Sequence, residues 1–282
     1  MTVDEFSTWL LNPHRRPLVM GVLNVTPDSF SDGGSFERVD RAVAHALLMC
    51  EEGADLIDVG GESTRPGAQP VDAEEQTRRV EPVIAEILRR MRVVISVDTT
   101  QSTVAHRSLD AGACMVNDIS AGRDDPAMLP LVARRGVPII LMHTQGTPAT
   151  MHLKPQYEDV LDDVRQFLLD RVGVATRQGI DMNRILLDPG IGFGKTTSHN
   201  LDLLRRLGEL SALGRPVVLG ASRKKFIGEI THEPEPKNRL MGTAAAVAWG
   251  VTNGAAIVRV HDVKQMTQVV RTIRAIQTGE IG

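Results

Sequence analysis

The 282-residue sequence contains few aromatic residues, few cysteines and no long apolar run. Aromatic residues make up only 3% of the chain, so its core must be mostly aliphatic, as the interior of a β/α barrel is. The two cysteines, Cys50 and Cys114, fall on an apolar helical face and at the start of a strand. We interpret them as buried free thiols, not as a disulfide or a metal site. No apolar stretch reaches the roughly 20 residues that cross a bilayer, so no membrane-spanning segment is expected.

The chain also lacks an excess of basic residues. Its formal net charge is −3 and its pI is near 6.3. Proteins that bind nucleic acid usually carry a basic surface, so nucleic acid is excluded as a partner. The first residues, MTVDEFSTWLLNPHRR, have early acidic side chains and no apolar signal-peptide region. A cytoplasmic protein is therefore expected.

Eight short apolar runs are present instead, each ending in a polar or charged residue and followed by a helix-like stretch. They cover residues 18–24, 54–60, 93–98, 114–118, 137–143, 184–190, 216–222 and 255–261. Continuous Val/Ile/Leu strands that alternate with helices indicate a parallel sheet buried on both faces. Eight such units predict a single (β/α)8 TIM barrel over residues 18–278, preceded by a lead-in of residues 1–17.

The connections support this fold. A glycine stands where six of the helices should end, at Gly53, Gly112, Gly136, Gly179, Gly214 and Gly254. The strand-to-helix connections at 26–35, 61–70, 143–155 and 222–238 are long and rich in Gly, Pro, Ser and Asp. Long loops in a compact domain are usually functional, and in a barrel these lie at the carboxyl ends of the strands, where active sites are found.

Two familiar motifs can be set aside. The segment GIGFGKT at residues 190–196 looks like a phosphate-binding loop, but that pattern requires a glycine at position 189, where this chain has Pro189. The histidines show no H-x-x-x-H pair, so a zinc site is not expected.

A Mg²⁺ ion needs only one or two protein oxygens when a substrate phosphate supplies the others, and Asn24 could provide one. A turn-forming Asn after a strand is the alternative interpretation of Asn24.

The residues at the strand ends form two chemical sets. Asp98, Asn117 and Asp188 offer oxygen acceptors, which suit a flat heterocycle with a guanidine-like edge. The second set is cationic and predicts a small anionic substrate; it comprises Arg65, Arg223, Lys224, Lys225, Arg259 and His261. Several alternatives remain open. Asp98 and Asp188 could cap helices, His143 could be a core histidine, and Arg223 and Lys225 could be solvated.

With these motifs in place, the chain resembles the bacterial dihydropteroate synthases. Eight ordered segments carry the resemblance, at residues 20–34, 57–68, 96–99, 116–120, 141–146, 187–195, 220–228 and 257–263. The resemblance implies a transferase that condenses p-aminobenzoate with 6-hydroxymethyl-7,8-dihydropterin pyrophosphate. It further implies Mg²⁺ as cofactor and a homodimer.

The family's site residues carry over onto matching positions of this sequence. The pterin would be bound by Asp98, Asn117, Asp188 and Lys224, with Arg259 on its face. Pyrophosphate and Mg²⁺ would be served by Asn24, Thr64, Arg259 and His261. The p-aminobenzoate pocket would be bordered by Thr64, Pro66, Phe193, Ser222 and Lys224. The catalytic set implied in this way is Thr64, Arg65, Lys224, Arg259 and His261.

Three alternative functions are weighed against this one. A methyltetrahydrofolate-corrinoid methyltransferase would need the three acceptors but no pyrophosphate clamp. A non-catalytic pterin-binding paralogue would be expected to lose Thr64 or Arg65, and both are present. An aldolase would need a Schiff-base lysine inside a strand, and no predicted strand contains one.

Overall fold

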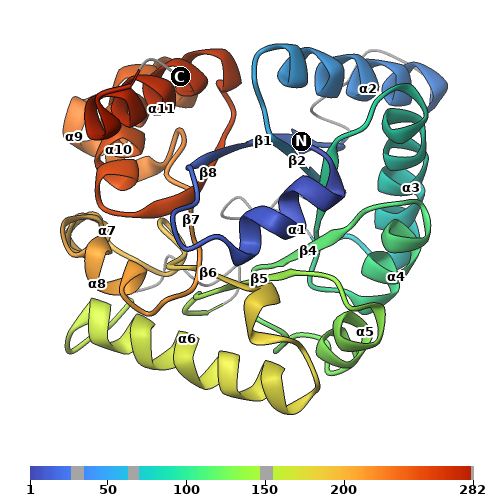
Figure 1. The fold of residues 1–282 in the computed structure, drawn as a ribbon, viewed down its shortest axis with the longest axis horizontal. Helices are drawn as coiled ribbons and strands as arrows, with labels where there is room; N and C mark the ends of the chain where they lie inside the picture. Colours follow the sequence, from blue (N-terminus) through green and yellow to red (C-terminus); the bar gives the residue numbers. More distant parts are fainter. Residues whose placement is uncertain (27–34, 63–69, 147–154, 281–282) are drawn as a thin grey trace.

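The computed structural model describes residues 1–26, 35–62, 70–146 and 155–280. Eight parallel strands pair in sequence order and close into one barrel, which confirms the predicted fold (Figure 1). The strands are β1 (Leu18–Asn24), β2 (Leu56–Gly60), β3 (Val94–Asp98), β4 (Met115–Asp118), β5 (Ile139–Met142), β6 (Ile185–Asp188), β7 (Val217–Leu219) and β8 (Ala255–Val260).

The helices surround the barrel, as Figure 1 shows. They are α2 (Ser35–Glu51), α3 (Ala73–Arg90), α4 (Ser102–Asp110), α5 (Met128–Arg135), α6 (Val160–Arg177), α7 (Thr197–Arg205), α8 (Leu207–Ser211), α9 (Lys225–Thr231), α10 (Leu240–Thr252) and α11 (Val263–Thr278), with short 3-10 turns η2 (Met182–Arg184) and η3 (Pro236–Asn238). All six glycines predicted to end helices have positive φ angles. Within the described residues, no helix combines the length and apolarity needed to span a membrane.

Several predicted boundaries were wrong; β6 and β8, for example, end before Gly190 and His261. The segment 222–238 is not an open loop, because it contains α9 and η3. Strand β5 ends one residue before His143, and β7 ends three residues before Ser222. In both places the chain leaves the sheet earlier than its apolar composition suggested, so these two side chains belong to loops over the barrel mouth.

The side chains inside the barrel change from apolar to polar along the barrel axis. One layer is apolar and consists of Met20, Leu56, Val94, Met115, Ile140, Leu186, Val218 and Ile257. Because side chains alternate across a strand, the residues two positions further along point to the same interior. Those residues are Val22, Asp58, Ser96, Asn117, Met142, Asp188, Gly220 and Arg259. The polar groups therefore gather at the carboxyl end above a solid aliphatic floor.

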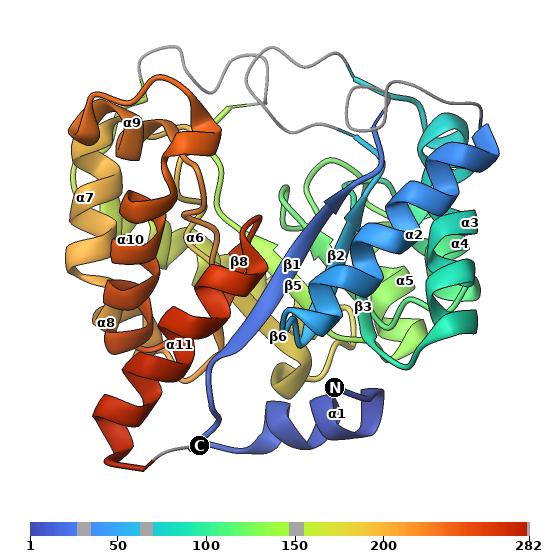
Figure 2. The same cartoon turned by 90° about the horizontal axis from the view of Figure 1, so that it is seen from above.

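Helix α1 (Val3–Leu11) covers the opposite end of the barrel (Figure 2). Its buried Phe6, Trp9 and Leu10 belong to the same apolar cluster as the inner strand residues. The indole Nε1 of Trp9 donates to the carbonyl of Arg16 at 2.7 Å, which ties the helix to the segment entering β1. With this end filled, a ligand can reach the polar layer only from the carboxyl end of the strands.

Candidate functional site

The predicted acceptors meet in one narrow pocket at the carboxyl ends of the strands. It is lined by Asp98, Asn117, Ile119, Met142, Asp188, Gly190, Ile191, Phe193, Gly220, Lys224 and Arg259. Six of these were predicted as site residues from the sequence. They come from β3, β4, β6, β8 and the segments after β6 and β7, so only closure of the barrel brings them together.

Arg259 is held by two carboxylates. Its Nε donates to Oδ2 of Asp58 and its Nη2 donates to Oδ2 of Asp98, both at 2.7 Å. Burial opposes the charge of Arg259, but the two carboxylates outweigh it and raise the pKa of the guanidinium above its usual range. Burial also raises the pKa of Asp98 to about 7, against the opposing effect of Arg259. The arginine is a fixed cation whose position is set from β2 and β3.

Asp188 and Lys224 lie on the other side of the pocket. Oδ1 of Asp188 accepts a 2.7 Å hydrogen bond from the backbone N–H of Gly190, and burial raises the pKa of this carboxyl group. Burial, together with the charge of Arg259, lowers the pKa of Lys224 to about 8. The ammonium of Lys224 lies 4.0 Å from the ring centroid of Phe193. A carboxylate, an ammonium and an aromatic face are therefore available side by side.

The helix-cap alternative for the two aspartates does not hold. Gln101 precedes α4, and Thr196 caps α7 with its own side chain. Asp98 and Asp188 instead line the pocket at the strand ends, where carboxylate oxygens can accept hydrogen bonds from a ligand.

His261 is oriented by Ser222. Its Nδ1 lies 3.0 Å from Oγ of Ser222, and its backbone N–H donates to the same oxygen at 3.2 Å. Burial and the nearby charges of Arg259 and Arg223 lower the pKa of His261 to about 3, so the ring is neutral. When Oγ–H of Ser222 donates to Nδ1, the ring proton is on Nε2, from which it can be donated to an anion. The sequence had implied a p-aminobenzoate contact for Ser222 and did not predict this role.

The glycines of the β6–α7 segment allow two backbones to approach closely. A Cβ on Gly190 would lie 1.9 Å from the carbonyl oxygen of His143, and one on Gly194 would lie 2.3 Å from the carbonyl oxygen of Gln145. Both glycines have positive φ angles, which side chains disfavour. The segment therefore packs directly on the chain that leaves β5. The motif that resembles a phosphate loop shapes the wall of the pocket.

The structure shows the contacts and the exposure of His143, Arg223 and Lys225. His143 is buried and neutral, because burial and the charge of Lys195 lower its pKa to about 2. Arg223 is not free in solvent; it forms an ion pair with Asp262 at 2.5 Å and adopts a positive φ of 59°. Lys225 is exposed and pairs with Glu229 on its own helix, at 3.1 Å. These three residues are not among those that line the pocket in the described part of the chain.

Asn24 ends β1 at the rim of the same mouth. Its Oδ1 and Cγ of Asp98 both lie 3.8 Å from the place where a side chain on Gly60 would begin. A side chain on Gly60 would make ordinary van der Waals contact with Asn24 and Asp98, so these two oxygen-bearing side chains lie close together beside this glycine. Among the described residues, no group of three His, Cys, Asp or Glu side chains could hold a metal by itself.

Thr64, Arg65 and Pro66 lie outside the described residues. Sequence reasoning missed two polar residues that the structure places at the site, Asp58 and Lys195. An aspartate inside the apolar strand ADLIDVG was the available signal, since a buried charge requires a partner. The two cysteines are free, as predicted, but only partly buried.

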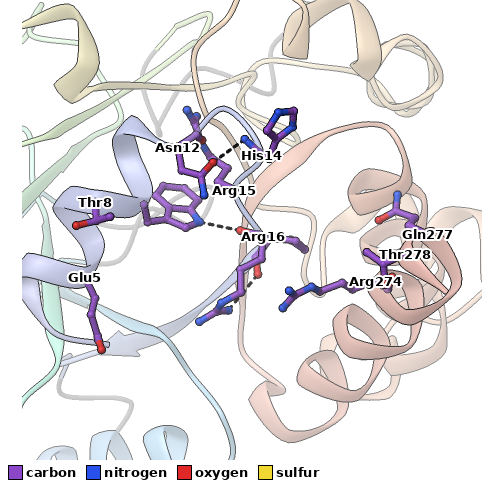
Figure 3. Close-up of a pocket in the computed structure, with 11 residues that line it drawn as sticks. Glu5, Thr8, Asn12, His14, Arg15, Arg16, Arg274, Gln277 and Thr278 are labelled. Atoms are coloured by element: carbon purple, nitrogen blue, oxygen red, sulfur yellow. Dashed lines mark hydrogen bonds between the residues drawn. The ribbon is translucent and has the colours of Figure 1, made fainter. Parts of the chain in front are cut away.

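A second pocket lies at the other end of the barrel and has a different character. It measures about 470 Å³ and is lined by residues of α1, the segment before β1 and the end of α11 (Figure 3). Two of its arginines have partners: Arg16 pairs with Asp55 at 2.5 Å, and Arg15 donates to the carbonyls of Asn12 and Leu10. The mouth pocket is much smaller, about 20 Å³, which is room for a single water molecule.

Comparison with known proteins identifies the family. Residues 20–261 match the family model described as pterin binding enzyme. Dihydropteroate synthases from Synechocystis and Escherichia coli K12 are both 46% identical to the chain, covering 93% and 92% of it and 91% of each relative.

Solved structures agree with these sequence matches. A Xanthomonas albilineans dihydropteroate synthase with 4-aminobenzoic acid superposes with a TM-score of 0.88 at 47% identity, over 93% of this chain and 94% of that one. A Yersinia pestis enzyme with a sulfonamide drug complex gives 0.89 at 42% identity, over 95% and 96%. The chain therefore belongs to the dihydropteroate synthase family of pterin-binding barrel enzymes, which are transferases.

Proposed function

We propose that the chain condenses p-aminobenzoate with 6-hydroxymethyl-7,8-dihydropterin pyrophosphate, giving 7,8-dihydropteroate and pyrophosphate. The observation that carries the proposal is the pocket in which three acceptor side chains, Asp98, Asn117 and Asp188, face the cations Lys224 and Arg259. A relative from Xanthomonas albilineans, 44% identical with a TM-score of 0.86, has been solved in complex with 7,8-dihydropteroate.

The acceptors are suited to the amino-pyrimidinone edge of a pterin. That edge carries adjacent N–H groups, which pair with carboxylate and carboxamide oxygens as a guanidinium does. Asp188 retains Oδ2 for the ligand, because only its Oδ1 is used by Gly190. Lys224 supplies the donor that a ring carbonyl or ring nitrogen requires. The guanidinium of Arg259, held flat by two carboxylates, can stack on the ring face.

The pyrophosphate end of the substrate would meet His261, Arg259 and Asn24. The neutral His261 can donate from Nε2 while Ser222 fixes its ring. The side-chain oxygen of Asn24, which lies at the strand ends near Asp98, would suit a Mg²⁺ ion that needs only one or two protein oxygens. When bound, the ion neutralises the charge that develops on the leaving group.

The chemical step exchanges one bond for another at the methylene carbon of the dihydropterin. The C–O bond to pyrophosphate breaks and its electron pair leaves with the phosphate, while the arylamine lone pair forms the new C–N bond. The amine then loses a proton to water. Because an arylamine is neutral at pH 7, its lone pair is available for attack and the reaction needs no strong base. Catalysis then rests on positioning and on electrostatic stabilisation of the separating charges.

The p-aminobenzoate site would lie beside Phe193 and Lys224, where an aromatic ring and an ammonium are 4.0 Å apart. Thr64 and Pro66 would complete it, with Arg65 beside the reacting centre. Incubation with the dihydropterin pyrophosphate, p-aminobenzoate and Mg²⁺, followed by mass spectrometry, tests the function directly. Absence of dihydropteroate in a folded, pterin-binding protein would favour a non-catalytic paralogue.

We further propose that the active form is a cytoplasmic homodimer, with residues 18–278 as its catalytic barrel and residues 1–17 as the lead-in. An apolar groove between α7, α9 and α10 supports self-association; its lining includes Leu201, Phe226, Ile230, Ala245 and Trp249. Trp249 and Ile230 are each about half exposed, at 49% and 51%. Sedimentation velocity should show a dimer, and Ile230→Lys should convert it to a monomer. The two free cysteines support the proposed cytoplasmic location, because thiols stay reduced in that compartment.

A further inference from the structure

Asp58 is a buried carboxylate in β2, where the residues next to it in the strand, Ile57 and Val59, are aliphatic. It has no exposed surface, and its Oδ2 accepts from Nε of Arg259 at 2.7 Å and from Nδ2 of Asn117 at 3.0 Å. Its Oδ1 is equally buried and has no hydrogen-bond partner among the described residues. Leaving a buried polar atom unpaired destabilises a fold, and apolar replacements of buried ion pairs are often neutral or stabilising. The presence of a carboxylate at this position is therefore not explained by stability, which points to a role in the site above it.

The first consequence of Asp58 concerns the amide of Asn117. A carboxylate has only acceptors to offer, so the group of Asn117 that faces Asp58 must be the Nδ2 donor. The carbonyl Oδ1 of the same amide is then left for the pocket that Asn117 lines. Asp58 decides which end of an otherwise symmetrical side chain is presented to a ligand.

The second consequence concerns the guanidinium of Arg259. Asp58 takes its Nε and Asp98 takes its Nη2, so two carboxylates from different strands fix its plane. The same bond occupies Oδ2 of Asp98 and leaves that residue with Oδ1. Asp98, Asn117 and Asp188 therefore all present oxygens to a ligand, and the arginine beside them cannot turn away.

We propose that Asp58 is a positioning residue that locks the Asn117 amide and the Arg259 guanidinium, and thereby makes the pocket select heterocycles whose edge carries N–H donors. It acts through these two residues and does not touch the ligand. The inference rests on the proposed function for the identity of the ligand. It extends that function by naming what sets the ring specificity.

Replacing Asp58 by Asn tests the lock. An asparagine can present either its oxygen or its nitrogen, so the amide of Asn117 would be free to rotate. Two probes should be compared by calorimetry: 6-hydroxymethylpterin, whose 2-amino group is a donor, and 6-hydroxymethyllumazine, whose 2-oxo group is an acceptor. The wild type should prefer the pterin strongly. In Asp58→Asn the pterin should bind about tenfold to hundredfold more weakly, and the pterin-to-lumazine affinity ratio should fall at least about tenfold.

The matched control is Asp55→Asn. Asp55 also belongs to the β2 region and pairs with an arginine, Arg16 at 2.5 Å, but at the opposite end of the barrel. Its loss should lower the melting temperature and leave the affinity ratio unchanged. An unchanged ratio in Asp58→Asn, whatever the fall in pterin affinity, would overturn the proposal and leave Asp58 a purely structural residue.

A second measurement needs only the wild-type protein, should Asp58→Asn not fold. In ¹⁵N-edited NMR, the side-chain NH₂ of Asn117 should exchange slowly with solvent both with and without bound pterin, because it donates to the buried Asp58. Rapid exchange of this NH₂ in the free protein would overturn the proposed lock. If the wild type forms no dihydropteroate, the proposed reaction fails, while the binding ratios still decide the role of Asp58.

Discussion

Lys195 and His143 form an unusual pair, in which the ammonium Nζ lies 2.9 Å from the ring Nδ1. The contact requires a neutral, accepting imidazole, which agrees with the strongly lowered pKa of His143. The same ammonium donates to the carbonyls of Gly190 and Phe193 at 3.0 Å each. One buried side chain thus ties the end of β5 to the segment that follows β6 and forms a wall of the ligand pocket. Burial lowers the pKa of Lys195 itself to about 7.

Lys195→Met should destabilise the protein. Methionine fills the space but leaves the carbonyls of Gly190 and Phe193 without their donor, at a cost of about 1–3 kcal/mol. Urea unfolding measures the change. Lys225→Met is the control, because the exposed Lys225 forms only a surface ion pair with Glu229, worth about 0–1 kcal/mol. Equal stability of the two variants would show that the Lys195 contacts add nothing.

Asp188→Asn should weaken pterin binding with little effect on the fold. The new Oδ1 can still accept from Gly190 N–H, but the NH₂ group would replace the acceptor that faces the ligand. Loss of a charge-assisted bond costs about 1.5–3 kcal/mol, or one to two decades in affinity. Calorimetry with a pterin analogue measures this, and wild-type affinity in a folded variant would remove Asp188 from the ligand site.

His261 and Arg259 should differ in what they bind. His261→Ala should weaken pyrophosphate binding more than binding of a bare pterin, because the ring lies at the strand end and donates to anions. Arg259→Lys should weaken both, since lysine keeps the charge but not the flat, two-sided contact with Asp58 and Asp98. Arg259→Ala is a poor probe, because it would leave two buried carboxylates unpaired. Identical effects of the two variants on both ligands would contradict this division.

The rate should fall on the alkaline side as Lys224 loses its proton. The pKa of Lys224 is lowered to about 8, so the ammonium is present below that pH and is lost as the pH rises through it. We expect kcat/KM, which reports the free enzyme, to decline above about pH 8. In Lys224→Arg this limb should move to higher pH, because a guanidinium stays protonated. A limb at the same pH in the variant would assign the titration to another group.

Asn24→Ala should raise the requirement for Mg²⁺. One side-chain oxygen beside Gly60 would be lost, while the pyrophosphate oxygens would remain. The Mg²⁺ concentration for half-maximal activity should rise several-fold, and Mg²⁺-dependent pyrophosphate binding should weaken in calorimetry. Unchanged values for both would favour the turn-forming role of Asn24.

The local sequence was sufficient to predict the barrel and most of the mouth. Apolar periodicity is a property of the local sequence, so it predicts the strands. Because the parallel strands of a barrel all end at the same edge, the sequence alone predicted that Asp98, Asn117 and Asp188 lie close together. The positions of the six helix-ending glycines were predicted for the same reason, because a left-handed residue is a local requirement.

The pairing of buried charges was decided only by the tertiary structure. Arg259 and Asp58 are 201 residues apart in sequence, and they meet because β8 pairs with β1 and closes the sheet. The link from Lys195 to His143 and the covering of the barrel floor by α1 depend in the same way on closure and packing. A sequence pattern shows that a buried charge needs a partner, but the partner is selected by distance in the folded barrel, which no local pattern encodes.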